Sequence, residues 1–126
     1  MRVFKNKWFN RWARGEDVSD SVLFKAAEEI LSGKVEADLG GYLFKKRLAQ
    51  AGRGKRGGYR TIVGYRKPNS ERIIFLYAFG KSEKANISER EEAALSLVAE
   101  AFIFATDKQV NELLSEGSIW EVKDNE

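Results

Sequence analysis

An α+β fold is predicted by three features of the 126-residue chain. Apolar residues recur at helical spacing near the N-terminus, segments of alternating polar and apolar residues follow, and two helix-capping motifs occur in the last third. Helices and strands are therefore segregated along the chain, as they are in α+β proteins. We expect a single domain over residues 1–126, because this length supports one core and no linker interrupts the sequence.

The N-terminal part is predicted to form a short strand and two helices. Val3–Lys5 is expected to be the strand, and the first helix carries Trp8 and Trp12 four residues apart on one side. We interpret both tryptophans as core residues. Ser19 is a candidate N-cap for the second helix, whose apolar stripe ends at Gly33 and is expected to pack on a sheet.

The first central strand is expected over residues 42–48. Its alternation places Lys45 and Arg47 on one face and the apolar side chains on the other, namely Tyr42, Phe44 and Leu48. Residues 49–58 are predicted to be a loop, because four glycines alternate there with basic residues. Such a loop lets backbone amides approach a phosphate closely, although it lacks the Gly-Lys-Ser/Thr step of a P-loop.

Two further strands and two more helices complete the prediction. Residues 59–66 alternate like a strand, 67–70 form a turn around a proline, and the nearly continuous apolar run 72–79 is typical of a central strand. These strands are expected to form an antiparallel meander. Capping boxes at Ser88/Glu91 and Thr106/Gln109 each predict a helix, and a terminal strand is expected at Ile119–Val122.

Charge is distributed unevenly along the chain. The net charge is only +3, yet residues 44–67 contain nine lysines and arginines and no acid. Residues 86–126 contain ten acids and three bases. This asymmetry indicates a basic surface directed at a polyanion, and an acidic surface elsewhere that repels the polyanion or meets another partner.

Composition excludes several kinds of catalytic site. The chain has no histidine and no cysteine, so it lacks the usual acid–base group at neutral pH and the thiol nucleophile. A metal-dependent site would need converging carboxylates, and the acids that flank the basic segment are few: Glu36, Asp38, Glu71 and Glu83. We therefore expect no metal and no other cofactor. The absence of a long apolar segment and of a signal peptide indicates a cytoplasmic protein with no membrane partner.

The basic residues suggest a site for RNA cleavage. Lys45, Arg47 and Arg60 can project from neighbouring strands, and Lys81 follows the central strand; these four are the candidate catalytic residues. Crowded cations lower one another's pKa, so that a lysine can accept a proton while an arginine stabilises charge on a phosphate. RNA supplies its own nucleophile, the 2′-OH. The candidate RNA-binding residues are Lys46, Arg53, Lys55, Arg56, Tyr59, Tyr77 and Lys84, with the tyrosines expected to stack on bases or to pack in the sheet.

Motifs along most of the chain resemble the HigB-type branch of the RelE toxin superfamily. The most specific are the run from Gly52 to Arg60, which ends in Gly-Gly-Tyr-Arg, and Phe79-Gly-Lys-Ser-Glu-Lys-Ala-Asn-Ile87. The resemblance covers about residues 3–115. It implies a compact RelE-like fold and ribosome-dependent cleavage of mRNA through the 2′-OH, hence translation inhibition. It also implies neutralisation by a protein antitoxin, often one with a helix-turn-helix. The family's basic residues correspond by position to Lys45, Arg47 and Arg60 here.

The chain departs from the family pattern at two positions. Ser82 stands where related toxins have an arginine, and their catalytic tyrosine corresponds to a position near Ser88. Lys81, Lys84 or Tyr77 are the candidates to replace them. Two alternative functions stay open: a ParE-like toxin that poisons DNA gyrase on the same fold, and a nucleic-acid-binding module without catalysis.

Overall fold

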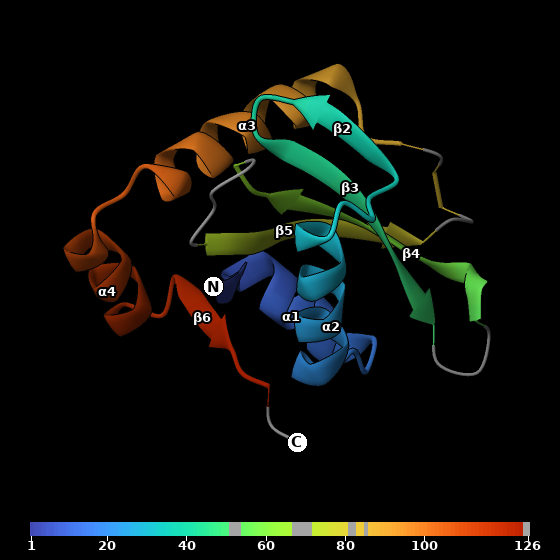
Figure 1. The fold of residues 1–126 in the computed structure, drawn as a ribbon, viewed down its shortest axis with the longest axis horizontal. Helices are drawn as coiled ribbons and strands as arrows, with labels where there is room; N and C mark the ends of the chain where they lie inside the picture. Colours follow the sequence, from blue (N-terminus) through green and yellow to red (C-terminus); the bar gives the residue numbers. More distant parts are fainter. Residues whose placement is uncertain (51–53, 67–71, 81–82, 85, 125–126) are drawn as a thin grey trace.

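The computed structural model describes residues 1–50, 54–66, 72–80, 83–84 and 86–124, and of Gln50 and residues 54–57 it describes the backbone alone. Within these residues a six-stranded sheet carries helices on both of its faces (Figure 1). The strand order is β2-β3-β4-β5-β1-β6. No helix in the described part of the chain is long and apolar enough to cross a membrane.

The N-terminal elements agree with the prediction. They are β1 (Arg2–Asn6), α1 (Lys7–Gly15) and α2 (Asp20–Leu31). Asn6 caps α1 by accepting a hydrogen bond of 2.7 Å from the Phe9 N–H, and its amide donates to the Leu76 carbonyl. Ser19 caps α2 as expected, because its hydroxyl accepts from the Val22 N–H. The Asn6 side chain thus joins the start of α1 to the middle of the sheet.

The central strands are β2 (Ala37–Gly40), β3 (Leu43–Gln50), β4 (Gly54–Gly64) and β5 (Arg72–Gly80). The loop expected at residues 49–58 is mostly strand, because β3 and β4 pair as far as Gln50 and Gly54. A glycine-rich segment can therefore extend a hairpin when its partner strand supplies the hydrogen bonds.

The prediction that Tyr42 lies on the same face of the sheet as Phe44 and Leu48 was wrong. Tyr42 adopts a left-handed φ of 66° just before β3, so the strand alternation does not reach it. Its ring packs edge-on against Phe104 at 5.6 Å, across the sheet from Phe44. Lys45 and Arg47 do share one face of β3, as predicted.

The last third of the chain forms α3 (Glu89–Ile103), α4 (Asp107–Ser115) and β6 (Ile119–Val122). Both predicted capping boxes are present, with reciprocal hydrogen bonds between cap and third residue. These hydrogen bonds set the residue at which each helix begins. The antiparallel sheet that we expected is in fact mixed, because β1 pairs in parallel with β5 and antiparallel with β6. A strand separated from its parallel neighbour by two helices and a meander leaves no local signal of that pairing.

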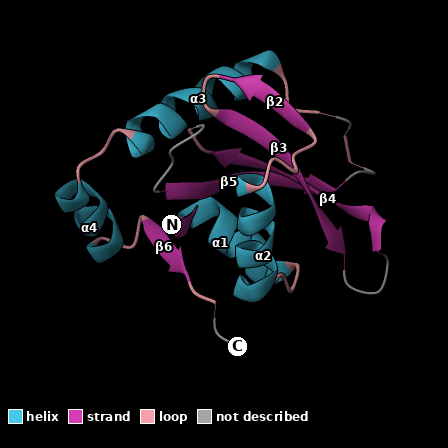
Figure 2. Ribbon diagram, in the orientation of Figure 1, coloured by secondary structure: helices cyan, strands magenta, loops and turns pink. Residues whose placement is uncertain are grey.

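Each face of the sheet has its own apolar core. In Figure 2, α1 and α2 lie together, and α3 runs along a separate side of the sheet. The first core joins α1 and α2 to the sheet through residues such as Phe9, Leu23 and Phe75. The second joins α3 and α4 through Phe79, Ala99 and others. The sheet is therefore the rigid layer on which both surfaces are built.

Buried ion pairs fix α2 against the sheet. Lys5 lies 2.8 Å from Asp20, and Lys46 lies 2.8 Å from Glu29. Both lysines are almost completely buried, so each needs its carboxylate partner to offset the cost of desolvation.

The close contact between β4 and α3 gives a stability prediction. A Cβ at Gly64 would lie 3.0 Å from Ile74 Cγ2 and 3.1 Å from Ala99 Cβ, both fully buried atoms. We expect Gly64→Val to lower the free energy of unfolding by about 1–3 kcal/mol, as overpacking does. Urea denaturation measures this. The matched control is Gly15→Val, where the added Cβ has no neighbour within 4 Å; equal losses in both variants would contradict the packing argument.

Candidate functional site

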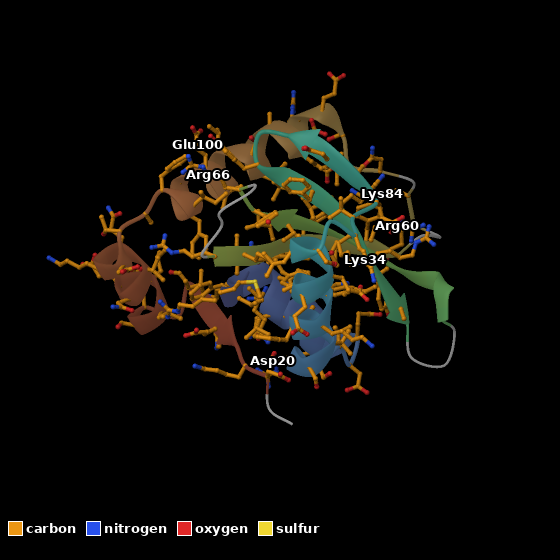
Figure 3. All side chains as sticks on the ribbon, in the orientation of Figure 1. Asp20, Lys34, Arg60, Arg66, Lys84 and Glu100 are labelled. Carbon is orange, nitrogen blue, oxygen red and sulfur yellow. The ribbon has the colours of Figure 1, made fainter. Side chains whose placement is uncertain are left out.

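The pairing of β3 with β4 brings three cations onto one face. Arg47 and Arg60 are direct partners in the register, and Lys45 lies two residues before Arg47, so its side chain points to the same side. Figure 3 shows Arg60 on β4 near Lys84, at the end of the sheet where α3 begins. We call Lys45, Arg47, Arg60 and Lys84, with Tyr77 of β5, the cationic face.

The two arginines hold unpaired donors inside this face. Arg47 Nε and Arg60 Nη1 are buried, and neither has a hydrogen-bond partner among the described residues. Arg47 lies 3.5 Å from Glu36, which is a long contact between half-buried groups and therefore weak. Within the described part of the chain, Arg60 and Lys45 form no ion pair. The register thus places two arginines opposite each other, and among the described residues one carboxylate, that of Glu36, lies against Arg47.

Lys84 completes the face from the loop before α3. Its Nζ donates to the Tyr77 hydroxyl at 3.2 Å and lies 3.0 Å from a Glu91 carboxylate oxygen. It also lies 5.0 Å from the Tyr77 ring centre and 5.5 Å from that of Phe79. Since Phe79 is the register partner of Arg60, Lys84 sits beside the arginine pair.

The hydrogen bonds around Lys84 set its protonation. The hydrogen bond to Glu91 raises the pKa of Lys84 most strongly, and the contact with Tyr77 adds to it. The pKa of Glu91 is lowered, chiefly by the Ser88 backbone N–H that donates to it and then by Lys84. The lowered lysine pKa that crowding suggested is therefore wrong for Lys84, because the hydrogen bond to Glu91 raises the pKa more than desolvation lowers it. Lys84 stays charged and suits binding of an anion.

An exposed tryptophan, Trp8, extends the cationic face by packing on Tyr77. The Trp8 ring lies 4.7 Å from the Tyr77 ring with a tilt of 33°, and Trp8 is 41% exposed. The sequence reading assigned Trp8 to the core with Trp12 and so missed this position. Phe9 is the residue that takes the buried place on α1, which leaves Trp8 on the flank; the spacing from Phe9 to Ala13 was the available signal.

Two of the expected RNA-binding residues lie on the opposite face of the sheet. Lys46 is 4% exposed and binds Glu29 and the Lys34 carbonyl. Tyr59 is 7% exposed, and its hydroxyl donates to Glu16 at 2.6 Å. Neither side chain can reach a ligand on the cationic face, because strand alternation directs both toward α1 and α2. They tie the helices to the sheet.

The remaining candidate site residues lie wholly or partly outside the described part of the chain. Lys81 and Arg53 are outside the described residues, and the side chains of Lys55 and Arg56 are not described. Ser82, one of the two departures from the family pattern, is also outside them. Ser88, the other, is the N-cap of α3: its hydroxyl accepts from the Glu91 N–H.

The carboxylates considered for a metal site do not converge. Glu36 contacts Arg47, Asp38 accepts a hydrogen bond from the Gly40 N–H, and Glu83 accepts one from the Gly80 N–H. Glu71 is outside the described residues. Among the residues that the structure describes, no cluster of three acidic side chains could hold a metal ion.

Comparison with known proteins identifies the family. Residues 1–122 match the model of the RelE toxin of the RelE/RelB toxin–antitoxin system. No curated protein matches the chain. The family match covers every described residue of the cationic face.

The Lys84–Glu91 contact gives a prediction about pH. Because the pKa of Glu91 is lowered in the folded protein, its carboxylate stabilises the fold above the ordinary glutamate pKa of 4.5, and this contribution disappears as the pH falls through the lowered value. Glutamine at this position keeps the capping hydrogen bond and removes the charge. We expect wild type to be more stable than Glu91→Gln at pH 7, with the difference shrinking as the pH falls below 4.5 and the carboxylate is protonated. Urea denaturation across this range measures it.

A second variant separates the two causes of the lowered Glu91 pKa, namely the Ser88 hydrogen bond and the contact with Lys84. In a Lys84→Met background the same comparison should give a smaller difference at pH 7, since only the Ser88 hydrogen bond remains. A difference that grows as the pH falls would contradict the assigned direction.

Proposed function

The chain belongs to the RelE family of toxins from toxin–antitoxin systems, and we propose that it cleaves messenger RNA on the ribosome without a metal ion. As a member of this family it has a cognate antitoxin. The proposal concerns the reaction, the substrate and the residues that act on it.

The arginine pair of β3 and β4 is the observation that supports this proposal. Like charges directly opposite each other destabilise a sheet, and here each arginine also has a buried donor without a described partner. A phosphate diester bound over the two strands would accept hydrogen bonds from the accessible part of the guanidinium groups and neutralise the repulsion. Guanidinium groups suit this role because they stay charged and can bind two oxygens at once.

The reaction uses the nucleophile that RNA carries. The ribose 2′-oxygen forms a bond to the adjacent phosphorus, and the bond from phosphorus to the 5′-oxygen of the next nucleotide breaks. One product ends in a 2′,3′-cyclic phosphate and the other in a 5′-hydroxyl that gains a proton. Arg47 and Arg60 stabilise the extra negative charge on the phosphate oxygens in the transition state.

Lys45 is the candidate to take up the proton that the 2′-hydroxyl loses when its oxygen attacks phosphorus. It lies on the same face as Arg47, and within the described part of the chain it has no carboxylate partner, in contrast to Lys84. Lys84 is held in its charged form and anchors the RNA backbone. Lys81 remains a catalytic candidate from the sequence, and Arg53, Lys55 and Arg56 remain candidate backbone contacts.

The pair of Trp8 and Tyr77 provides a platform for a base. Trp8 extends the cationic face by packing on Tyr77, and Trp8 is exposed enough to stack on a base turned out of the messenger. In the proposal Trp8 replaces Tyr59, and Lys46 is left out, because both Tyr59 and Lys46 are buried on the other face.

The central test is removal of Arg60. We expect Arg60→Ala to lower the rate of mRNA cleavage by about a hundredfold or more, as loss of a group that stabilises the transition state does. Thermal stability should hardly change, since Arg60 forms no ion pair within the described residues. Cleavage is measured by mapping mRNA 5′ ends on translating ribosomes after brief induction. Arg14→Ala, which removes an exposed arginine of α1, is the matched control and should cleave like wild type.

Further measurements test the role of the 2′-OH and distinguish the proposed reaction from the two alternative functions. In a purified translation system, a messenger with a single 2′-deoxy sugar at the cleaved position should remain intact, whereas the same messenger with ribose at that position should be cut. Wild-type cleavage by Arg60→Ala would refute the site. Intact mRNA with gyrase-dependent DNA breaks would favour the gyrase toxin, and salt-sensitive binding without cut ends would favour a binding module.

A further inference from the structure

Helix α3 has apolar side chains on its outer side as well as on its inner side. Ala99 and Phe102 are buried against the sheet. On the outer side, Leu97 is 70% exposed, Val98 is 47% exposed, and Phe104, directly after the helix, is 53% exposed. The exposed alanines of the same side join them into a continuous strip: Ala93, Ala94 and Ala101. We call these six residues the outer α3 stripe.

Apolar residues on two opposite sides of a helix are typical of one that is covered on both of these sides. The first side of α3 is covered by the sheet. No helix or strand in the described ranges lies over the other side, which forms an outer edge of the molecule in Figure 1. Contiguous exposed apolar residues on a soluble protein mark a site of protein contact.

Charges around the outer α3 stripe indicate which kind of macromolecule can bind there. Glu89 and Glu100 are exposed and lie along one border of the stripe. The whole segment 86–126 carries ten acids and three bases. The acidic border disfavours RNA and favours a protein segment whose apolar side chains are flanked by lysine or arginine, while the exposed Arg90 and Arg66 leave the rest of the surface with charges of the other sign.

One end of the stripe contains groups that anchor protein interfaces. The Arg66 guanidinium carbon lies 5.1 Å from the centre of the Phe104 ring, and Tyr42 packs against the other side of this ring at 5.6 Å. Aromatic residues and arginine are the types that dominate binding energy at interfaces. Their fixed arrangement here means that little order must be gained on binding.

We propose that the outer α3 stripe is the docking surface of the cognate antitoxin, which presents an apolar segment bordered by basic residues. The inference depends on membership of the toxin–antitoxin family and not on the cleavage of RNA. The surface is distinct from the cationic face, although both use α3, whose Glu91 holds Lys84.

Binding can be measured without any toxin activity. The chain carrying Arg60→Ala is titrated with the purified antitoxin expressed from the gene adjacent to its own, by calorimetry. We expect Leu97→Asp to weaken binding at least tenfold, since it places a charge in the apolar centre. The matched control, Val22→Asp, alters a residue of α2 that is 41% exposed and should bind like the parent protein.

A charge reversal provides a second, independent measurement. Glu100→Lys should weaken binding and reduce its dependence on salt, whereas Glu112→Lys on α4 should not. Equal affinity of Leu97→Asp and Val22→Asp would overturn the proposal. So would a dimer of the chain alone that Leu97→Asp dissociates, because the stripe would then be covered by a second copy. Neither result depends on whether the protein cleaves RNA.

Discussion

The pairing of Arg47 with Arg60 is the constraint on which the candidate site depends. The register of β3 and β4 places the two residues opposite each other on one face, and that register is fixed by the apolar residues on the other face, such as Leu48 beside Tyr59. A slip of β3 by one residue would turn Arg47 toward the core and Leu48 away from it. The fold therefore holds two like charges side by side, and in the proposed function an anionic ligand relieves their repulsion.

Cations lie in different environments on the two faces of the sheet. On the α1 and α2 face, every cation that approaches the core has a partner: Lys5 binds Asp20, and Lys46 binds Glu29. On the other face, α3 covers the apolar part and begins beside Lys84, so the cations beyond it stay partly open. The same kind of side chain is thus buried with a carboxylate on one face and only half-buried on the other, where we propose that it binds a ligand.

Much of the fold was predictable, because local signals determine most of its elements. The caps at Ser19, Ser88 and Thr106 marked the helices, and strand alternation placed Lys45 and Arg47 together. The parallel pairing of β1 with β5 was not predictable, since no local pattern encodes it. For the same reason the sequence could not reveal that Trp8 meets Tyr77, whereas strand alternation already indicates that Lys46 shares the face of Phe44 and Leu48.

The most direct test of the site observes the arginines themselves. Nuclear magnetic resonance of the arginine side-chain N–H groups can follow a titration with a short RNA protected by 2′-O-methyl sugars, at low salt. The signals of Arg47 Nε and of the Arg60 guanidinium should shift together and saturate, while that of Arg2, which is bound to Glu121, should stay in place. Saturable RNA binding that leaves Arg47 and Arg60 unchanged would contradict the proposed site.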